Sequence, residues 1–536
     1  MLYNGVMRHQ RQHPNHTPKR ATYQLTLPFE LGVLIESSEP VHVMLNLTER
    51  LDYSHLNASY TRQPSEKEAS PKQMFQLVLL GFMEGTHTTR KLESSCKHDI
   101  RFMYVLQGKK APDHNRFWSF IKHRLQGAVA EHLFYQLSNY LYDAGEIDLA
   151  NLFVDGTKIE ANANRYTFVW KKSTNKYEAR LDNKMDEFFN HLLNTYPLEI
   201  PSSASPDVCL NILRTHADSQ NTLFVHGRGK RKTQLQRDIE MLESYLIRKC
   251  KYKNYNDIFK GRNSFSKTDP DATFMRMKDD HMMNGQLKPG YNLALGVSGE
   301  YIVGVDISSE RSDQLTLIPL LDRMEQGMDG KRFENIGLDA GYESEENYTA
   351  LESRGIAAFI KPQNYEKSKT RKFKNNVYLL ENMPYHVDTD TYTCPANQPF
   401  VFSYTCTRKS ASGFKSNVTV YECHACTGCP QKSECTRAKG NRKLYVAKDF
   451  LAFRKQSLER ITSEQGKILR LNRSIQSEGA FGVLKEDYGF RRFARRGSTN
   501  VLTEVLIYAM AYNVNKFCNK QKRKLRGVIL HQLKSA

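Results

Sequence analysis

The stretch Asn151-Leu-Phe-Val-Asp155-Gly-Thr-Lys158 organises the rest of the chain. The apolar run from Leu149 to Val154, with one polar interruption, predicts a buried strand that ends on an acid followed by the turn residue Gly156. Taken alone, an Asp-Gly pair indicates only a turn. An acid at the C-terminal end of a strand, however, lies where α/β sheets place their ligands. Asp155 is therefore a candidate site residue.

Two further acids downstream strengthen this interpretation of Asp155. Ile336-Gly-Leu-Asp339 is another short apolar run that ends on an acid, and it predicts a second strand-end carboxylate. Glu478 lies in a helical segment between Arg473 and Lys485. On a helix, Lys485 shares the face of Glu478 two turns away, whereas Arg473 lies somewhat round from it. One acid between two cations suits a site beside a phosphate backbone better than a solvated surface.

Asp155, Asp339 and Glu478 together resemble the D-D-E triad of insertion-sequence transposases. That family has a retroviral-integrase-like RNase H fold and a Y-R-E-K signature near its glutamate. The resemblance covers roughly residues 70 to 515, interruptions included. The fold class expected from the resemblance and the sequence patterns is α/β: an RNase H-like mixed sheet core with a helical N-terminal domain, a helical insertion and a small zinc-binding insertion.

The stretch around Glu478 carries the most specific part of the resemblance. Lys485 falls on the signature's lysine. Leu471 stands at the position of its tyrosine and Ser474 at that of its arginine, with Arg473 one residue early. An offset of one residue turns a helical side chain by about 100°. The signature is thus matched at the glutamate and the lysine and departs from the family pattern at the other two positions.

The resemblance implies a DNA transposase that cuts the ends of an insertion element and joins them to target DNA. Both steps are in-line displacements, in which two metal ions about 3.5 to 4 Å apart can activate the attacking oxygen and stabilise the leaving one. Oxygen ligands suit Mg²⁺, with Mn²⁺ as its substitute. We expect Asp155 to bridge the two ions, Asp339 to bind one and Glu478 the other. By analogy with the family, cutting can pass through a hairpinned end.

Two other functions fit the same residues. A non-catalytic DNA-binding protein descended from such an enzyme would keep the basic surface, although an intact triad disfavours it. A metal-dependent nuclease would cleave DNA and lack strand transfer. Metal-dependent cleavage of an element-end duplex distinguishes a transposase from the first alternative, and a target-joining assay distinguishes it from the second.

Other acids compete for the role of the second aspartate. Asp306 also ends a predicted strand, Tyr301 to Ile307, and is the main rival of Asp339. Asp269 and Asp271 lie in a Thr-Asp-Pro-Asp turn, where aspartates usually accept hydrogen bonds from backbone amides. We therefore expect the two turn residues to cap local backbone amides.

A second motif is formed by cysteines. Cys423-His-Ala-Cys426-Thr-Gly-Cys429-Pro-Gln-Lys-Ser-Glu-Cys435 has C-x2-C-x2-C-x5-C spacing. Four thiolates can close a tetrahedral site for a structural Zn²⁺. His424 can substitute for one cysteine, and iron-sulfur ligation is the rival, because three cysteines at this spacing also suit a cluster. We favour zinc. The other cysteines are expected to be ordinary thiols: Cys96, Cys209, Cys250, Cys394, Cys406 and Cys518.

The net charge points to a polyanionic partner. Lys and Arg total 78 against 58 Asp and Glu, a formal charge of +20, which favours double-stranded DNA, here terminal inverted repeats and target DNA. Short helices beginning at Ser70, Thr88 and Asp113 resemble a helix-turn-helix unit, with an ordinary helical bundle as an equal alternative. The residues expected to contact DNA are Arg116, Lys122, Arg124, Arg473, Lys485, Arg491, Arg492, Arg495 and Arg496. For the last four, a solvated basic loop is the alternative.

The sequence contains no segment that we expect to anchor in a membrane. Residues 1–10 lack the apolar core of a signal peptide. We therefore expect a bacterial cytoplasmic, nucleoid-associated protein whose ten cysteines form no disulfide framework. Because transposition brings two element ends together, we also expect a homodimer on DNA.

A chain of 536 residues is long enough for three or four domains. The expected segments are a poorly defined N-terminal stretch (1–65), a helical DNA-binding region (66–142), the first part of the catalytic core (143–170), a helical insertion (171–262), the second part of the core (263–362), a cysteine-rich insertion (363–450), and the glutamate helix with basic C-terminal helices (451–536).

Overall fold

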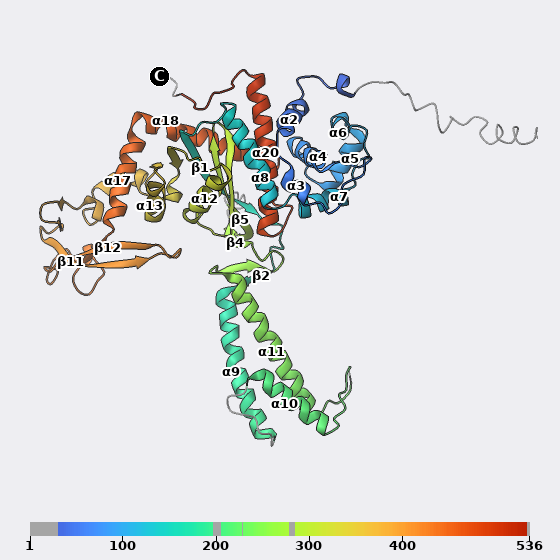
Figure 1. Ribbon diagram of the computed structural model, residues 1–536. Helices are drawn as coiled ribbons and strands as arrows, with labels where there is room; N and C mark the ends of the chain where they lie inside the picture. The colour runs from blue at the N-terminus through green and yellow to red at the C-terminus, as the bar shows by residue number, and fades with distance from the viewer. Residues whose placement is uncertain (1–30, 197–204, 228, 278–284, 533–536) are drawn as a thin grey trace, which may run out of the picture. The chain divides into compact units, whose positions relative to one another are not determined.

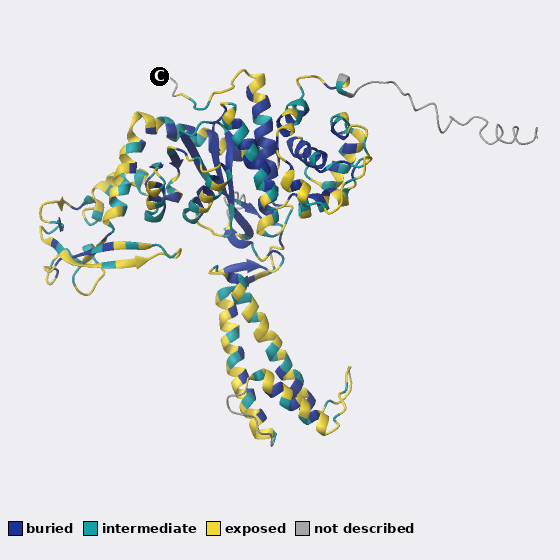
Figure 2. Ribbon diagram, viewed as in Figure 1, coloured by how far each residue is buried: buried dark blue, intermediate teal, exposed yellow. Residues whose placement is uncertain are grey.

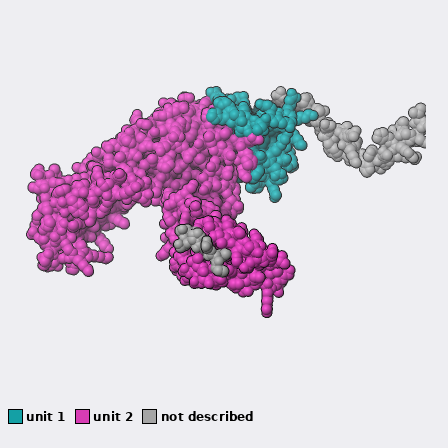
Figure 3. All heavy atoms as spheres, turned by 60° about the horizontal axis from the view of Figure 1, so that its bottom comes forward, with its two compact units in different colours: residues 1–120 teal, residues 121–536 magenta. Residues whose placement is uncertain are grey.

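The structure is a computed structural model and describes residues 31–196, 205–227, 229–277 and 285–532. The chain divides into two compact units, residues 1–120 and residues 121–536 (Figure 3). Across the described ranges, no helix is both long and apolar enough to cross a membrane.

The first unit consists of short helices around one almost fully buried helix, α4 (Pro71–Met83). Ser70 caps α4 and forms a capping box with Gln73, as the sequence predicts. The predicted helix starts at Thr88 and Asp113 are also confirmed, because both side chains cap their helices. The other elements of the unit are η1 (Leu31–Leu34), α2 (Pro40–Glu49), α3 (Ser54–Ala58), α5 (Thr89–His98), α6 (Ile100–Leu106) and α7 (His114–Ser119).

The sequence patterns do not predict three helices of this unit, α2, α3 and α6. In α2 the buried apolar side chains are Val41, Met44 and Leu47, spaced three residues apart. A stripe this narrow does not stand out in a polar segment. The docking of these helices on DNA stays a prediction.

The second unit is organised around a mixed sheet with β1 (Asn151–Glu160) at its centre. On one side, β1 pairs antiparallel with β5 (Leu287–Ser298), and β5 pairs antiparallel with β6 (Tyr301–Ser308). On the other side, β1 pairs parallel with β7 (Asn335–Leu338), and β7 pairs parallel with β8 (Ala357–Ile360). The mixed sheet expected from the sequence is therefore confirmed. Figure 1 shows its strands β1 and β5 among the surrounding helices.

The course of β1 differs from the prediction in one respect. The predicted strand ends at Asp155, but β1 continues to Glu160, and Asp155 pairs with Leu295 of β5. The Asp-Gly pair is therefore strand and not turn. The parallel pairing with β7 stops at Val154, opposite Leu338. Asp155 thus lies where β1 leaves β7 and continues alongside β5 alone.

The longest C-terminal helix, α20 (Ser498–Lys522), is buried over most of its length and contacts β6 (Figure 2). Its Asn513 accepts a hydrogen bond from the backbone N–H of Ile302 and donates one to the carbonyl of the same residue. This amide thereby satisfies backbone groups at the edge of the sheet. A further strand of the sheet, β4 (Thr273–Arg276), pairs antiparallel with the start of β5. Helical elements complete this part of the chain: η2 (Phe120–Arg124), α8 (Ala128–Asp143), η3 (Asp313–Leu315), α12 (Leu317–Gly327), η4 (Ala340–Tyr342) and α13 (Glu345–Ser353).

Helices form the stretch between β1 and β4, as the periodicity predicts, but they number three within its described residues: α9 (Lys171–Thr195), α10 (Pro206–Ser219) and α11 (Gln234–Phe259). Leu192, Leu213 and Leu242 are fully buried where the three meet. The short strand β2 (Phe168–Trp170) pairs with β3 (Ser264–Ser266) in a separate two-stranded ribbon. In the basic cluster 227–232, residue 228 lies outside the described residues.

The cysteine-rich stretch has more regular structure than its composition predicts. It forms an antiparallel sheet in the order β13-β12-β11-β10-β9 with its own apolar core. The strands are β9 (Tyr385–His386), β10 (Thr391–Thr393), β11 (Pro399–Lys409), β12 (Lys415–Glu422) and β13 (Lys443–Val446). Short helices accompany them: α14 (Tyr365–Ser368), α15 (Arg371–Lys374), η5 (Leu380–Asn382) and α16 (Lys432–Cys435).

The predicted helix from about 451 to 485 is confirmed as a series of joined helical segments. They are α17 (Lys448–Thr462), α18 (Glu464–Arg473), the π-helical turn η6 (Ser474–Glu478), α19 (Gly479–Gly482) and a second π-helical turn, η7 (Val483–Asp487). π-Turns inside helices often mark functional sites, and the first of these two ends on Glu478.

Candidate active site

Two aspartates lie where the parallel pairing of β1 with β7 ends. Asp155 follows Val154 in β1, and Asp339 follows Leu338 at the end of β7. Val154 and Leu338 are opposite each other in parallel register, so the next residues of both strands emerge together. The backbone ladder therefore sets the position of both aspartates.

Arg473 links the glutamate to this sheet edge. Its Nη1 lies 3.9 Å from Oδ2 of Asp155, and its Nη2 lies 3.5 Å from Oε1 of Glu478. Residues five apart are turned by about 140° on an α-helix. Because η6 is π-helical, its wider turn reduces this angle and allows Arg473 and Glu478 to meet. One guanidinium thus joins two of the three predicted triad residues.

Buried amide side chains hold the helix that carries the glutamate. Gln476 donates a 2.9 Å hydrogen bond to the carbonyl of Ile529 and accepts a 2.9 Å hydrogen bond from the backbone N–H of Glu300. Asn472 donates to the carbonyl of His531 and accepts from its N–H, both at 2.8 Å. The helix is therefore fixed between the β5–β6 turn and the C-terminal segment. The available sequence signal was a pair of polar residues at i and i+4.

A fourth carboxylate, Asp313 of η3, borders the same space and is absent from the sequence prediction. Its Oδ1 accepts a 2.7 Å hydrogen bond from Nδ2 of Asn292. A Cβ placed on Gly156, the residue after the first aspartate, would lie 3.1 Å from this Oδ1. The pKa of Tyr342 is raised well above its ordinary value, first by burial and then by the carboxylates of Asp313 and both triad aspartates. These acids therefore surround one buried phenol.

The donor set at this site suits a hard divalent cation in its chemistry, since carboxylate oxygens are the protein ligands that Mg²⁺ prefers. Among the described residues, however, no three Asp, Glu, His or Cys side chains are arranged to hold one ion. Near the triad, the guanidinium of Arg473 contacts the carboxylates of both Asp155 and Glu478. The positively charged side chain of Arg473 is therefore the group that joins these two carboxylates.

A basic pocket of about 400 Å³ adjoins Asp339. Within it, Lys361 pairs with Glu366 at 3.0 Å, and the guanidinium of Arg470 lies 5.4 Å from the centre of the Tyr365 ring. The pocket is lined by Leu338, Asp339, Lys361, Lys467, Arg470, Leu471 and Arg473. Four cations beside one triad aspartate form a pocket suited to a phosphate group.

The rival aspartates have structural partners. Asp306 is buried and pairs with Arg323 at 3.2 Å, and burial raises its pKa to about 6 despite that pairing. Asp269 accepts hydrogen bonds from the Tyr291 hydroxyl and the backbone N–H of Gly497, and Asp271 caps the start of α20. Both turn residues thus accept hydrogen bonds from backbone amides, but from those of the distant Gly497 and Ser498, whereas the sequence predicts local amides.

The arginine run after the glutamate helix makes extensive contacts within the protein. Arg491 pairs with Glu486 at 2.6 Å. Arg492 donates to the carbonyls of Ala161 and Ala163, and Arg496 donates to that of Asn162, so both bind the loop that follows β1. Arg491 and Arg492 nevertheless leave about half of their side-chain surface exposed, 48% each.

Arg495 differs from its neighbours because its side chain points inward. It lies beside the buried Glu504, which accepts hydrogen bonds from the backbone N–H groups of Ala494 and Arg495. Burial lowers the pKa of Arg495 and raises that of Glu504. A side chain in this position is a poor candidate for a DNA contact.

The other predicted DNA contacts lie outside this run. Arg116 is exposed on α7 and forms an ion pair with Glu68. Lys122 and Arg124 belong to η2 and are partly buried, as is Lys485 in η7.

The cysteines of the predicted zinc motif lie around one small pocket. Cys423, Cys426, Cys429 and Cys435 line it together with Cys394, which the sequence prediction treats as an ordinary thiol. All ten cysteines are free thiols. The four motif residues and a fifth cysteine therefore line one pocket, although no three of these side chains are placed to hold one ion in the described structure.

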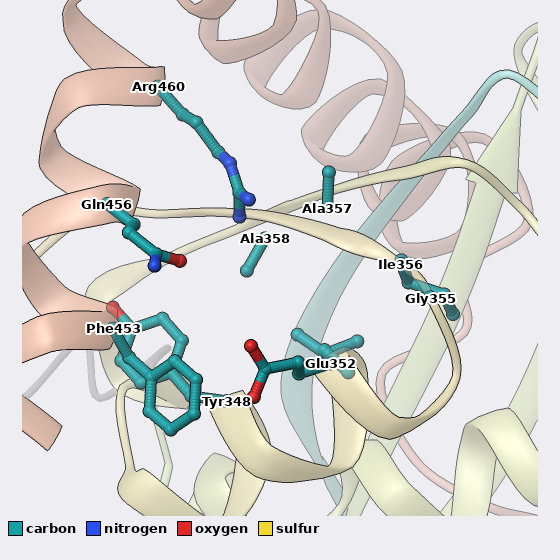
Figure 4. Close-up of a pocket in the computed structure, with 10 residues that line it drawn as sticks. Tyr348, Glu352, Gly355, Ile356, Ala357, Ala358, Phe453, Gln456 and Arg460 are labelled. Atoms are coloured by element: carbon teal, nitrogen blue, oxygen red, sulfur yellow. The ribbon is translucent and has the colours of Figure 1, made fainter. Parts of the chain in front are cut away.

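A different pocket, of about 230 Å³, lies between α13, β8 and α17. Figure 4 shows Arg460 and Gln456 of α17 facing Glu352 of α13, with the stacked rings of Tyr348 and Phe453 at one side. None of the predicted site residues lines this pocket.

Two family models match parts of the chain. The model of the transposase DDE domain matches residues 393–518, which contain the cysteine motif, Glu478 and most of α20. The model of a transposase domain, DUF772, matches residues 30–123. No curated protein and no solved structure matches the chain. Both matching models describe transposase domains, one near each end of the chain, and together they support an insertion-sequence DDE transposase.

Proposed function

We propose that this transposase cuts DNA at the ends of its insertion element and joins the freed ends to target DNA, with Asp155, Asp339 and Glu478 as its catalytic triad. The observation that carries the proposal is that Asp155 and Asp339 follow the last paired residues of the β1–β7 ladder, while Arg473 contacts both Asp155 and Glu478. The sheet order β6-β5-β1-β7-β8, with its last three strands parallel, supports an RNase H-like core.

The three carboxylates would hold the divalent cations on which this family depends, two in the proposed mechanism. When bound, Mg²⁺ or Mn²⁺ ions activate the attacking oxygen and stabilise the leaving oxygen of an in-line displacement. Asp155 is central, because it lies between the β7 aspartate and the arginine that reaches Glu478. Asp313 adds negative charge behind the triad. Among the described residues, no contact joins Asp313 to Glu478.

Arg473 has a role of its own in this proposal. In the absence of cations its guanidinium keeps the carboxylates of Asp155 and Glu478 close, which lowers the repulsion between them. Once cations balance these acids, the guanidinium is free to bind the phosphate that is being cut. It then fulfils the task of the arginine in the family signature from a position one residue earlier.

The basic pocket beside Asp339 is the proposed binding site for a phosphate next to the cut. Lys467, Arg470 and Arg473 reach it from α18, and Lys361 enters from the end of β8. Arginine and lysine side chains at phosphates set the position of DNA without reading its sequence. Further backbone contacts are proposed for Arg116, Lys122, Arg124, Lys485, Arg491, Arg492 and Arg496.

The cysteine pocket completes the proposal as a structural Zn²⁺ site. Thiolates from Cys423, Cys426, Cys429 and Cys435 are the predicted ligands, and their common pocket supports this assignment. A homodimer on double-stranded DNA, with each subunit holding one element end, is the proposed assembly in the cytoplasm.

The test uses duplexes that reproduce the DNA flanking the gene on each side. Purified protein with Mg²⁺ should cut these duplexes at the element boundary, and a pre-cut end with a free 3′ hydroxyl should be joined to a plasmid. Asp155→Asn should abolish both activities, and Asp306→Asn is the matched control outside the site. Cleavage without joining would favour a nuclease. DNA binding without Mg²⁺- or Mn²⁺-dependent cleavage would favour a DNA-binding protein derived from a transposase.

A further inference from the structure

Cys394 lies far from the cysteine motif in sequence and next to it in space. It directly follows β10, and Cys423 directly follows β12. Both strands pair antiparallel with β11 at its first residues, Thr393 with Pro399 and Glu422 with Val401. The ends of β10 and β12 therefore emerge on the two sides of β11 at the same end of the small sheet.

The neighbouring side chains confirm this closeness. The rings of Tyr392 and Tyr421, one on each strand, lie 5.3 Å apart. Cys394 and Cys423 are both buried, at 9% and 2% exposure, and both line the small pocket that holds the rest of the motif. Cys406 is a useful contrast, because it lies on β11 opposite Val418, is half-buried and is not among the pocket residues.

Several sulfur atoms in this pocket accept hydrogen bonds from N–H groups. The backbone N–H of Gln398 donates to Sγ of Cys394 at 3.3 Å. The backbone N–H of Arg442 donates to Sγ of Cys426 at 3.4 Å, and its Nη1 donates to Sγ of Cys435 at 2.9 Å. These polar contacts distinguish the pocket from the surroundings of a cysteine used only for packing.

We propose that Cys394 is a metal ligand that joins Cys423 and Cys426 around a tetrahedral Zn²⁺, with the fourth thiolate supplied by Cys429 or Cys435. This assignment rests on the zinc site proposed above and changes its ligand set. The ion would tie the end of β10 to the end of β12 and to the loop before β13. It would thereby stabilise a module whose own apolar core is small.

The motif alone did not suggest this ligand, because Cys394 has no cysteine partner at short spacing. The stretch Cys394-Pro-Ala-Asn397-Gln398 instead forms a tight turn, in which Asn397 adopts a positive φ of 56° and its N–H binds the carbonyl of Cys394. The turn directs the following N–H, that of Gln398, at the sulfur. One side of the site is therefore built by a single cysteine and the backbone of its own turn.

The test compares Cys394→Ser with Cys406→Ser in the full chain. Zinc per chain is measured by elemental analysis after purification, and zinc retention is measured against a competing chelator. We expect about one zinc per wild-type chain, the same value for Cys406→Ser, and at least tenfold weaker retention for Cys394→Ser. Retention of zinc by Cys394→Ser at the wild-type level would overturn the proposal. Iron with acid-labile sulfide in place of zinc would overturn it as well.

Cobalt substitution keeps the test decisive if Cys394→Ser folds poorly. The intensity of the thiolate-to-Co²⁺ absorption reports the number of thiolate ligands, and the conservative variant Cys394→His retains a donor at the position. We expect this variant to bind Co²⁺ with the absorption of three thiolates instead of four, and the same measurement on Cys429→Ser and Cys435→Ser identifies the fourth ligand. An unchanged thiolate absorption in Cys394→His would contradict the proposal. Asp155→Asn should keep its zinc, so a failure of the DNA chemistry and a failure of this metal site are separable.

Discussion

The two aspartates and the glutamate of the site are held in different ways. Asp155 and Asp339 extend from paired strands, and hydrogen bonds of the backbone ladder set their positions. Glu478 ends a π-helical turn whose position depends on side-chain hydrogen bonds from Gln476 and Asn472. The side chain of Asp155 is 16% exposed and that of Glu478 is 58% exposed.

This difference suggests a division of labour. The sheet supplies a rigid pair of acids, and the helix brings a third acid that can adjust when DNA and cations arrive. Arg473 lies between the two parts, since it contacts one acid of each. Substitutions of the sheet acids should therefore reduce DNA cleavage more than substitutions of the residues that position the helix.

The largest effect is expected for the sheet acids. Asp155→Asn and Asp339→Asn keep the shape of each side chain and remove the charge that binds cations, a contribution of several kcal/mol to the reaction. We expect cleavage to fall by about 10³-fold or more for each variant. Single-turnover cleavage of the element-end duplex measures this, and Asp306→Asn is the control. Wild-type cleavage by Asp339→Asn would remove that residue from the triad.

Arg473→Ala is expected to change two quantities in opposite directions: the affinity for Mn²⁺ should rise and the cleavage rate should fall, by less than for the sheet acids. Without the guanidinium, the carboxylates of Asp155 and Glu478 lose a competing cation, so the protein without DNA should bind Mn²⁺ more tightly. The same variant loses a charged contact to the phosphate, worth about 1.5 to 3 kcal/mol, so cleavage should fall about 10- to 100-fold. Calorimetric titration with Mn²⁺ and the cleavage assay measure the two effects. If Mn²⁺ affinity and the cleavage rate both rise or both fall, Arg473 does not have the two proposed roles, one at the carboxylates and one at the phosphate.

Replacing Gln476 tests whether catalysis depends on the position of the helix that carries Glu478. Gln476→Leu leaves the carbonyl of Ile529 and the N–H of Glu300 without this partner, at a cost of about 1 to 3 kcal/mol for each buried group. We expect a lower melting temperature and a cleavage rate reduced about tenfold, with DNA affinity unchanged. Gln476→Glu is the conservative companion, since it keeps an acceptor for the N–H of Glu300. An unchanged cleavage rate in a destabilised Gln476→Leu would show that the helix position does not limit catalysis.

The same comparison explains which parts of the site can be predicted from sequence. Short apolar runs ending in Asp155 and Asp339 are local patterns, and helical periodicity around Glu478 is another, so all three acids stand out along the chain. The mixed sheet and the helix starts at Ser70, Thr88 and Asp113 follow from the same local signals.

Contacts between distant segments leave no such signal. Gln476 is held by residues of the C-terminal segment and the β5–β6 turn, and Cys394 reaches its neighbours through the pairing of three strands. Asp313 is the first residue of η3, and acids are common at helix starts because they interact favourably with the helix dipole. The sequence therefore gives no sign that Asp313 lies beside the triad. The extension of β1 beyond Asp155 has the same origin, because pairing with β5 overrides the turn preference of Asp-Gly.

A moderate effect is expected for Asp313→Asn. The amide can still accept the hydrogen bond from Asn292, so the fold should persist, but one negative charge beside the triad aspartates is lost. Cation binding should weaken by a few-fold, and cleavage should require more Mg²⁺ to reach its maximal rate. The Mg²⁺ dependence of cleavage measures this shift, with Asn292→Asp as a companion that adds charge at the same contact. An unchanged Mg²⁺ dependence would leave Asp313 with a purely structural role.

The smallest effect on catalysis, and a clear effect on stability, is expected for Asp306→Asn. Burial raises the pKa of Asp306 to about 6, above its value of about 4 in the unfolded chain. The folded state therefore binds this proton more tightly, and the resulting stabilisation is fully present below about pH 4 and is lost as the pH rises to about 6. The shift corresponds to roughly 2 to 3 kcal/mol, reduced in practice by the pairing with Arg323. Melting temperatures between pH 4 and 7 should fall less steeply for the variant than for the wild type, while cleavage at neutral pH stays unchanged. Loss of cleavage in Asp306→Asn would instead make this acid part of the site and remove the distinction between sheet acids that bind cations and sheet acids that only pack.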